Sequence, residues 1–126
     1  MSKIPDISFS WSEGRYFDLW SLVHSLSGIT LGFIIAFLQI QTVLAYTLAF
    51  VIIVLWEVFE KSVGIHETKE NRVLDIVVGM IFFVVAYKVS DMIQANAQES
   101  LTIFSVLVLA FLTLIGWLDY RKRQRR

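Results

Sequence analysis

The stretch Trp56–Gly79, WEVFEKSVGIHETKENRVLDIVVG, joins two apolar segments of this 126-residue chain and concentrates charge between them. Glu57 and Glu60 stand at the end of the first apolar segment, and Asp75 stands just inside the second. A carboxylate inside or at the edge of a hydrophobic segment is costly, so it usually faces protein, water or a ligand. The stretch therefore predicts a polar site where two helices meet.

The composition is typical of a membrane protein rather than of an ordinary soluble domain. Hydrophobic residues make up 56% of the chain, the mean hydropathy is +0.66, and the apolar residues occur in long blocks. Cysteine is absent from the sequence, which excludes disulfides, thiolate catalysis and zinc–thiolate sites. The first sixteen residues are polar and mixed in charge, so we expect no cleavable signal peptide.

Four segments are long enough to cross a bilayer, which takes about 20 residues of helix. The predicted spans are residues 17–38, 41–60, 73–92 and 101–117. Residues 1–16 are expected to form an interfacial N-terminal segment, and residues 119–126 a basic tail. The predicted fold is all-α, a four-helix transmembrane bundle that occupies residues 17–118.

The basic residues predict the orientation of this bundle. Ten of the eleven lysines and arginines fall on the side that holds both termini and the 61–72 loop, and Lys88 is the exception. This asymmetry predicts an N-in/C-in protein of the inner membrane, with both termini cytoplasmic. The tail RKRQRR is expected to contact anionic lipid. It is short and lacks interleaved aromatic residues, so we expect no nucleic-acid partner.

The first predicted span carries a stripe of small and polar residues. Ser21, His24, Ser25, Gly28 and Gly32 recur at helical spacing on one face. The two glycines, four residues apart, allow another helix backbone to approach closely. An ionisable residue within a span is a functional candidate, which favours a functional role for His24. The alternative is a packing role in which His24 donates to a neighbouring carbonyl.

The second span ends in two carboxylates that need compensation. Glu57 and Glu60 are three residues apart and share one helix face. The C-terminal end of a helix disfavours negative charge, so a cation, a proton or a basic partner must offset them. Lys61, Lys69 and Arg72 are the basic candidates within the chain.

The third span begins with a polar stripe. Asn71, Asp75 and Gly79 follow one another at intervals of four residues, and Gly79 is expected to pack against another helix. Asp75 lies in the first turn, where the helix dipole stabilises a carboxylate, so a purely structural role is the alternative to a ligand role. The loop adds His66 and Glu67 as secondary candidates, although such residues are more often solvated.

A common depth brings these candidates together. His24, Glu57 and Asp75 belong to three different spans and lie within a few turns of the same end of the bundle, at about 1.5 Å of rise per residue. Histidine with carboxylates suits zinc, manganese or iron, and carboxylates with an amide suit magnesium. The predicted polar site comprises His24, Glu57, Glu60, Asp75 and Asn71, with Ser21, His66 and Glu67 as secondary members, and the first four are candidate ligands of a divalent metal ion.

These motifs resemble those of a known family. The pattern WE-x-x-E at residues 56–60, Glu and Asn in a short loop, and Asp75-x-x-x-Gly79, with His24 in the preceding span, resembles small VanZ-like and YjdF-like bacterial membrane proteins. The likeness covers the first three spans, about two-thirds of the chain. It implies a small bacterial inner-membrane protein, associated in some relatives with envelope stress or glycopeptide resistance, and it assigns no reaction.

Three classes of function remain open at this point. The first is a site for a divalent cation or a lipid phosphate headgroup at the cytoplasmic leaflet, with hydrolysis linked to the cell envelope as its enzymatic form. The second is a non-catalytic partner or structural subunit, in a homo-oligomer or beside another membrane protein, whose polar cluster fixes helix packing. The third is proton or ion translocation, which the outer halves of the spans disfavour because they offer only Thr30, Thr47 and Lys88.

Overall fold

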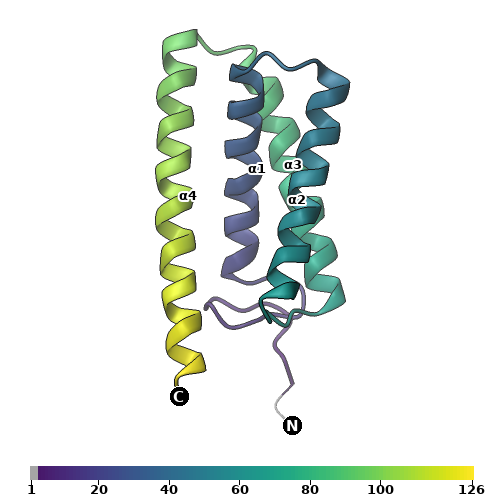
Figure 1. The fold of residues 1–126 in the computed structure, drawn as a ribbon, viewed down its shortest axis with the longest axis vertical. Coiled ribbons are helices and arrows are strands. Elements are labelled where there is room, and N and C mark those ends of the chain that lie inside the picture. Colours follow the sequence, from purple (N-terminus) through teal and green to yellow (C-terminus); the bar gives the residue numbers. More distant parts are fainter. Residues whose placement is uncertain (1–2) are drawn as a thin grey trace.

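The computed structural model describes residues 3–126 as four helices joined by short connections. The helices are α1 (Leu19–Phe37), α2 (Thr42–Ser62), α3 (Lys69–Ser90) and α4 (Ala95–Gln124). They run alternately up and down one axis, so the N-terminal segment and the C-terminal residues lie at the same end of the bundle (Figure 1). We refer to this end as the terminal end and to the other as the opposite end.

The predicted all-α, four-helix fold is confirmed. All four helices are long and apolar enough to cross a membrane. Many of their large apolar side chains are exposed, as Leu107 (63%) and Phe104 (66%) illustrate on α4. An exposed apolar surface of this extent is unusual for a soluble monomer and is expected of helices that face lipid. The architecture is compatible with a multi-pass membrane protein.

The helices extend beyond the predicted spans at several ends. α3 begins at Lys69 rather than at residue 73, and α4 covers Ala95–Gln124 rather than residues 101–117. Hydropathy reports where a helix is apolar, whereas a helix continues into polar sequence while its backbone groups remain bonded or capped. The Thr68 side chain accepts from the Asn71 N–H at 3.1 Å and so caps α3. Since α4 continues to Gln124, most of the basic tail expected at residues 119–126 is helical.

The N-terminal segment folds back beneath the terminal end. Ile7 forms a β-bridge with Phe17, and the Ser8 N–H donates to the Phe17 carbonyl at 2.8 Å. The Trp11 ring packs edge-on against Trp20, with centroids 5.1 Å apart. The segment is therefore a compact loop that packs against the start of α1.

α1 is the central helix of the bundle. It packs most extensively on α3 and also contacts α4, while α2 packs mainly on α3 (Figure 1). The glycines of α1 face α3: a Cβ on Gly28 would overlap the Gly79 carbonyl oxygen, and one on Gly32 would lie 2.7 Å from the Cβ of Ala86. Because α1 and α3 both start at the terminal end, this close packing places their first turns side by side.

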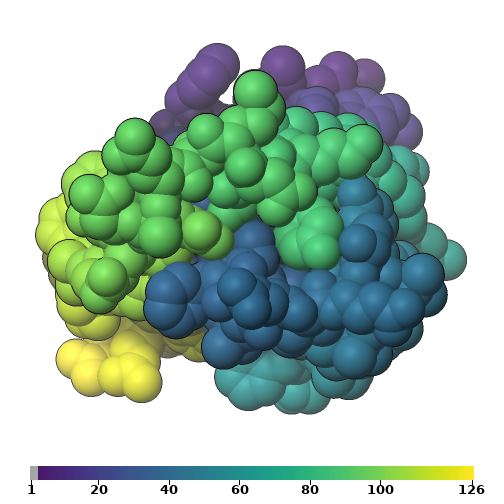
Figure 2. Space-filling model, turned by 90° about the horizontal axis from the view of Figure 1, so that it is seen from above, coloured from purple at the N-terminus to yellow at the C-terminus, as the bar shows by residue number. Residues whose placement is uncertain are grey.

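The opposite end is closed by apolar packing. Viewed from that end, the α1–α2 turn and the α3–α4 connection cover the bundle (Figure 2). Ile35, Ala45, Ala49 and Phe83 form the core beneath them. The buried ionisable side chains among the described residues lie elsewhere, near the terminal end, and they are Asp18, His24, Glu57, Glu60 and Asp75.

Candidate functional site

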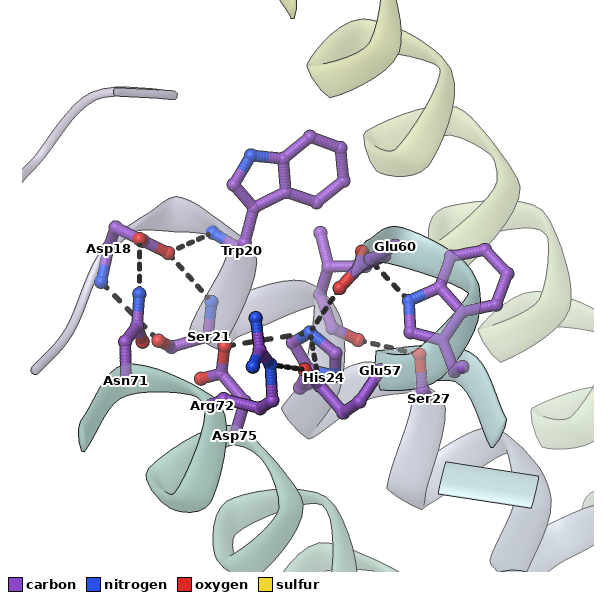
Figure 3. Close-up of polar contacts among 12 residues, drawn as sticks. Asp18, Trp20, Ser21, His24, Ser27, Glu57, Glu60, Asn71, Arg72 and Asp75 are labelled. Atoms are coloured by element: carbon purple, nitrogen blue, oxygen red, sulfur yellow. Dashed lines mark hydrogen bonds and ion pairs between the residues drawn. The ribbon is translucent and has the colours of Figure 1, made fainter. Parts of the chain in front are cut away.

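Asp18 sets the start of α1 and joins it to α3. Its Oδ1 accepts from the backbone N–H groups of Trp20 at 2.9 Å and Ser21 at 3.2 Å, and the Ser21 hydroxyl accepts from the Asp18 N–H at 3.3 Å. This reciprocal pattern is a capping box. The other carboxylate oxygen, Oδ2, accepts from Asn71 Nδ2 at 2.8 Å (Figure 3). The first turns of α1 and α3 are thus held together by one buried carboxylate.

Six residues further along α1, His24 faces three carboxylates from two other helices. Its Nε2 lies 3.3 Å from Glu57 Oε1, 3.7 Å from Glu60 Oε2 and 3.6 Å from Asp75 Oδ2 (Figure 3). None of the four side chains is more than 3% exposed. The fold therefore brings His24 of α1, Glu57 and Glu60 of α2, and Asp75 of α3 together, and we refer to these four residues as the buried cluster.

Most polar atoms of the buried cluster have no hydrogen-bond partner among the described residues. This holds for His24 Nε2, both oxygens of Glu57, both oxygens of Asp75 and Oε2 of Glu60. Glu60 Oε1 differs because it accepts from Trp56 Nε1 at 2.9 Å. A buried polar group left unpaired costs about 1–3 kcal/mol, and native structures contain few of them. A ligand bound jointly by these atoms would remove that cost.

One basic residue reaches the buried cluster. Arg72 Nε lies 3.7 Å from Glu57 Oε2, and the Arg72 side chain is 26% exposed. The other two basic candidates, Lys61 and Lys69, are exposed and take part in none of the ion pairs seen among the described residues. With all three carboxylates ionised, the single guanidinium would leave two negative charges in excess. A divalent cation would neutralise that excess.

Three members of the buried cluster could hold a metal ion. One ligand atom each from His24, Glu57 and Asp75 lies within 4.8 Å of the others, and all three residues are buried. They come from three helices, so the position that they surround is fixed by the packing of the bundle. An imidazole nitrogen with carboxylate oxygens is a donor set that zinc, manganese and iron accept.

A second acidic group adjoins the first. Oxygens of Glu57, Glu60 and Glu67 lie within 4.8 Å of one another. Glu67 belongs to the α2–α3 connection and is half-buried. Burial in the first place, and the neighbouring Asp18 carboxylate in the second, raise the pKa of Glu67 to about 7. A fourth carboxylate thus stands at the edge of the buried cluster, and its charge depends on pH near neutrality.

The raised pKa of Glu67 predicts that the metal-free protein loses stability as the pH rises. A folded-state pKa of about 7 against an ordinary value of 4.5 gives a contribution that is fully present below about pH 4.5 and lost as the pH passes about 7. We expect the melting temperature of the metal-free protein in detergent to fall from about pH 5 to about pH 8, and to fall less in Glu67→Gln. Glu99→Gln, at an exposed carboxylate of α4, is the matched control. Identical pH profiles for Glu67→Gln and the parent would contradict this prediction.

Two predicted members stand apart from the buried cluster, and a third borders it. Asn71 is fully buried, but its amide donates to Asp18 and, at 3.3 Å, to the Gly14 carbonyl. His66 is exposed in the α2–α3 connection, whereas Ser21 belongs to the capping box of α1 and its side chain also lies beside Asp75. Asn71 and Ser21 therefore hold the helix ends in place, and His66 lies at the surface.

Two residues that contribute to the site, Asp18 and Trp56, are not among its predicted members. Asp18 is signalled by the pattern Asp-x-x-Ser ahead of an apolar segment, which is a sequence mark of a helix start. Trp56 precedes Glu60 by four residues, a spacing that places the two side chains on one face of α2. Each signal is local, whereas the partner of Asp18 in α3 is 53 residues away.

Comparisons with protein-family models, with curated proteins and with solved structures found no match to this chain. The geometry of the buried cluster is therefore the basis for the function proposed below.

Proposed function

We propose that this protein binds one divalent transition-metal ion in the buried cluster. The observation that supports the proposal is the convergence of His24 Nε2, Glu57 Oε1 and Asp75 Oδ2 from three helices, all buried and all without a hydrogen-bond partner among the described residues. Such groups are costly in a membrane-spanning bundle unless a partner satisfies them. A cation satisfies all three at once.

The surroundings of the three atoms suit this ion. His24 in its neutral form offers a lone pair, and the three carboxylates, once ionised, would with Arg72 leave two negative charges to be neutralised. Glu60 Oε2, 3.7 Å from His24 Nε2, is available as a fourth ligand. The bond from Trp56 to Glu60 Oε1 would orient that carboxylate, as outer hydrogen bonds commonly do at metal sites.

The neighbouring polar contact shows how a structural role differs. Asp18 and Asn71 also meet between α1 and α3, yet both Asp18 oxygens accept hydrogen bonds. A cluster that served helix packing alone would be expected to be paired in the same way. Translocation is the weaker alternative, because the other buried polar residues among those described in the four helices are Ser21, Thr30, Asn71, Ser90 and Ser105, and none of them can titrate.

The setting of the site extends the proposal to the membrane surface. Ten of the eleven basic residues lie toward the terminal end, which favours a cytoplasmic location for that end in the inner membrane. A phosphate headgroup is an anion that a cation beside Arg72 would bind, either as a ligand or as the substrate of a hydrolysis. Membership of a VanZ-like family is part of the same proposal, because the motifs that resemble that family contain His24, Glu57 and Asp75, the three candidate ligands.

Calorimetric titration of the metal-stripped protein tests the proposal. In detergent, Zn²⁺ and Mn²⁺ are expected to bind with a stoichiometry of one per chain and with release of protons at neutral pH. Mg²⁺ prefers oxygen ligands and is expected to bind far more weakly to a site with an imidazole nitrogen. A helical protein that shows no saturable binding of Zn²⁺ or Mn²⁺ would refute the proposed function.

A further inference from the structure

An apolar cavity of about 350 Å³ lies between α1, α2 and α4. Its walls are mainly aliphatic and include Ile34 of α1, Ile52 of α2 and Leu109 of α4. The volume falls within the range of about 300–1,000 Å³ that is usual for small-molecule sites. We refer to this space as the side cavity, because it lies on the flank of α1 that α2 and α4 border.

The side cavity ends at the buried cluster. His24 lines the cavity, and its Nε2 is also the atom closest to the three carboxylates. Trp56 lines the cavity as well and donates to Glu60. From His24 to Ile34, α1 rises by about 15 Å, so the space runs along the helix from the proposed cation site toward the opposite end. His24 thus borders both the apolar side cavity and the charged buried cluster.

We infer that the side cavity holds the hydrocarbon chain of a lipid whose phosphate headgroup binds at the buried cluster. This inference rests on the proposed cation site. A molecule that is apolar along one part and anionic at one end matches the two adjoining environments. With two of the three carboxylates ionised, the cation and Arg72 leave one positive charge in excess, and Arg72, whose Nε has no hydrogen-bond partner among the described residues, would direct that charge to the phosphate.

A buried, unpaired hydroxyl on a residue that lines the side cavity favours an acyl lipid over a plain alkyl chain. Thr30 lines the cavity, is 4% exposed, and its Oγ1 has no hydrogen-bond partner among the described residues. A helical threonine often donates to the carbonyl four residues back, as Thr47 does to Val43 at 2.9 Å. The Thr30 hydroxyl lies about 9 Å of helix rise beyond His24, where an ester oxygen near the headgroup would accept from it.

Ordered water fits the side cavity less well than a lipid chain does. A mainly aliphatic space of this kind remains dry rather than filling with ordered water. A flexible hydrocarbon chain matches both the apolar walls and the elongated shape of the space.

Binding of defined amphiphiles to the zinc-loaded protein tests the inference. The probes are oleoyl lysophosphatidic acid, monoolein, which has the same chain without phosphate, and glycerol 3-phosphate, which has the headgroup without the chain. Native mass spectrometry is expected to show one lysophosphatidic acid per chain, bound at least about tenfold more tightly than either of the other probes. Equal binding of glycerol 3-phosphate or of monoolein would overturn the inference.

Two variants locate the bound chain. Leu109→Trp fills the side cavity from α4 and is expected to weaken binding of lysophosphatidic acid by about tenfold or more while the zinc content is unchanged. Leu107→Trp, at a side chain on α4 that is 63% exposed and outside the cavity, is the matched control and should bind like the parent. Thr30→Val keeps the side-chain shape, and it should weaken binding of lysophosphatidic acid but not of its alkyl-ether analogue.

The outcomes separate the two proposals. Parent-like binding of lysophosphatidic acid by both Leu109→Trp and Thr30→Val would overturn the lipid inference and leave the cation site standing. A parent protein that binds no zinc but still loses lysophosphatidic acid in Leu109→Trp would refute the proposed function and leave the acyl-chain site standing.

Discussion

Glu57→Gln is expected to abolish binding of the divalent ion while leaving the bundle folded, and Asp75→Asn is expected to do the same. Each substitution keeps the shape of the side chain and replaces a charged ligand by a poor one. Loss of an outer hydrogen bond at a metal site already lowers affinity by about 10–100-fold, so loss of a direct ligand should exceed about 100-fold. Metal content after dialysis against a fixed free Zn²⁺ concentration measures the effect.

Melting temperatures of the same proteins distinguish a cation site from a purely structural cluster. At a free Zn²⁺ concentration about 100 times Kd, the ion should stabilise the parent by about 2.7 kcal/mol, and Glu57→Gln should lose that increment. If the carboxylates served only packing, the neutral isosteres would relieve repulsion and the parent would show no zinc-dependent stabilisation. Glu70→Gln, at an exposed carboxylate in the first turn of α3, is the control that should retain both zinc and its stabilisation.

Gly28→Leu is expected to cause the largest loss of stability of any single change considered. A side chain at this position meets the backbone carbonyl of Gly79, which cannot move aside as a flexible side chain would. Overpacking costs about 1–3 kcal/mol where neighbours can adjust, and this site should lie at or above the upper limit. Because α1 and α3 would have to separate, the His24–Asp75 contact of 3.6 Å should be lost as well.

Thermal unfolding in detergent checks this prediction. Ala110→Leu, at an exposed position of α4, introduces the same side chain where space is open and is expected to melt like the parent. A melting temperature for Gly28→Leu equal to that of the parent would refute the close packing of α1 on α3.

The helices and the members of the buried cluster could be predicted from the sequence because each is indicated by a pattern within a single segment. Long apolar segments predict spans, and the common depth of His24, Glu57 and Asp75 follows from counting residues along each span. The glycine pair in α1 likewise signals a close helix contact, although the sequence does not show that α3 is the partner. These features depend on one helix at a time.

Features that depend on contacts between residues far apart in the sequence could not be predicted in this way. The hydrogen bond from Asn71 to Asp18 joins residues 53 apart in the sequence. Because of this bond, Asn71 lies outside the buried cluster, although its depth and spacing predicted that it would be a member. Arg72 was one of three basic candidates, and the spacing along α3 did not show which one would reach Glu57. The side cavity exists because α4 packs on α1. The sequence of α4 is apolar on all sides of its membrane-spanning part, so no pattern in it indicates which helix it packs against.

Anomalous diffraction at the zinc absorption edge, from crystals of the zinc-loaded protein, would show whether His24, Glu57 and Asp75 hold a divalent cation. The expected result is one strong peak between α1, α2 and α3, about 2.0–2.2 Å from His24 Nε2 and from one oxygen each of Glu57 and Asp75. Zinc found only elsewhere, for example at the exposed His66, with no peak inside the buried cluster, would contradict the proposed cation site.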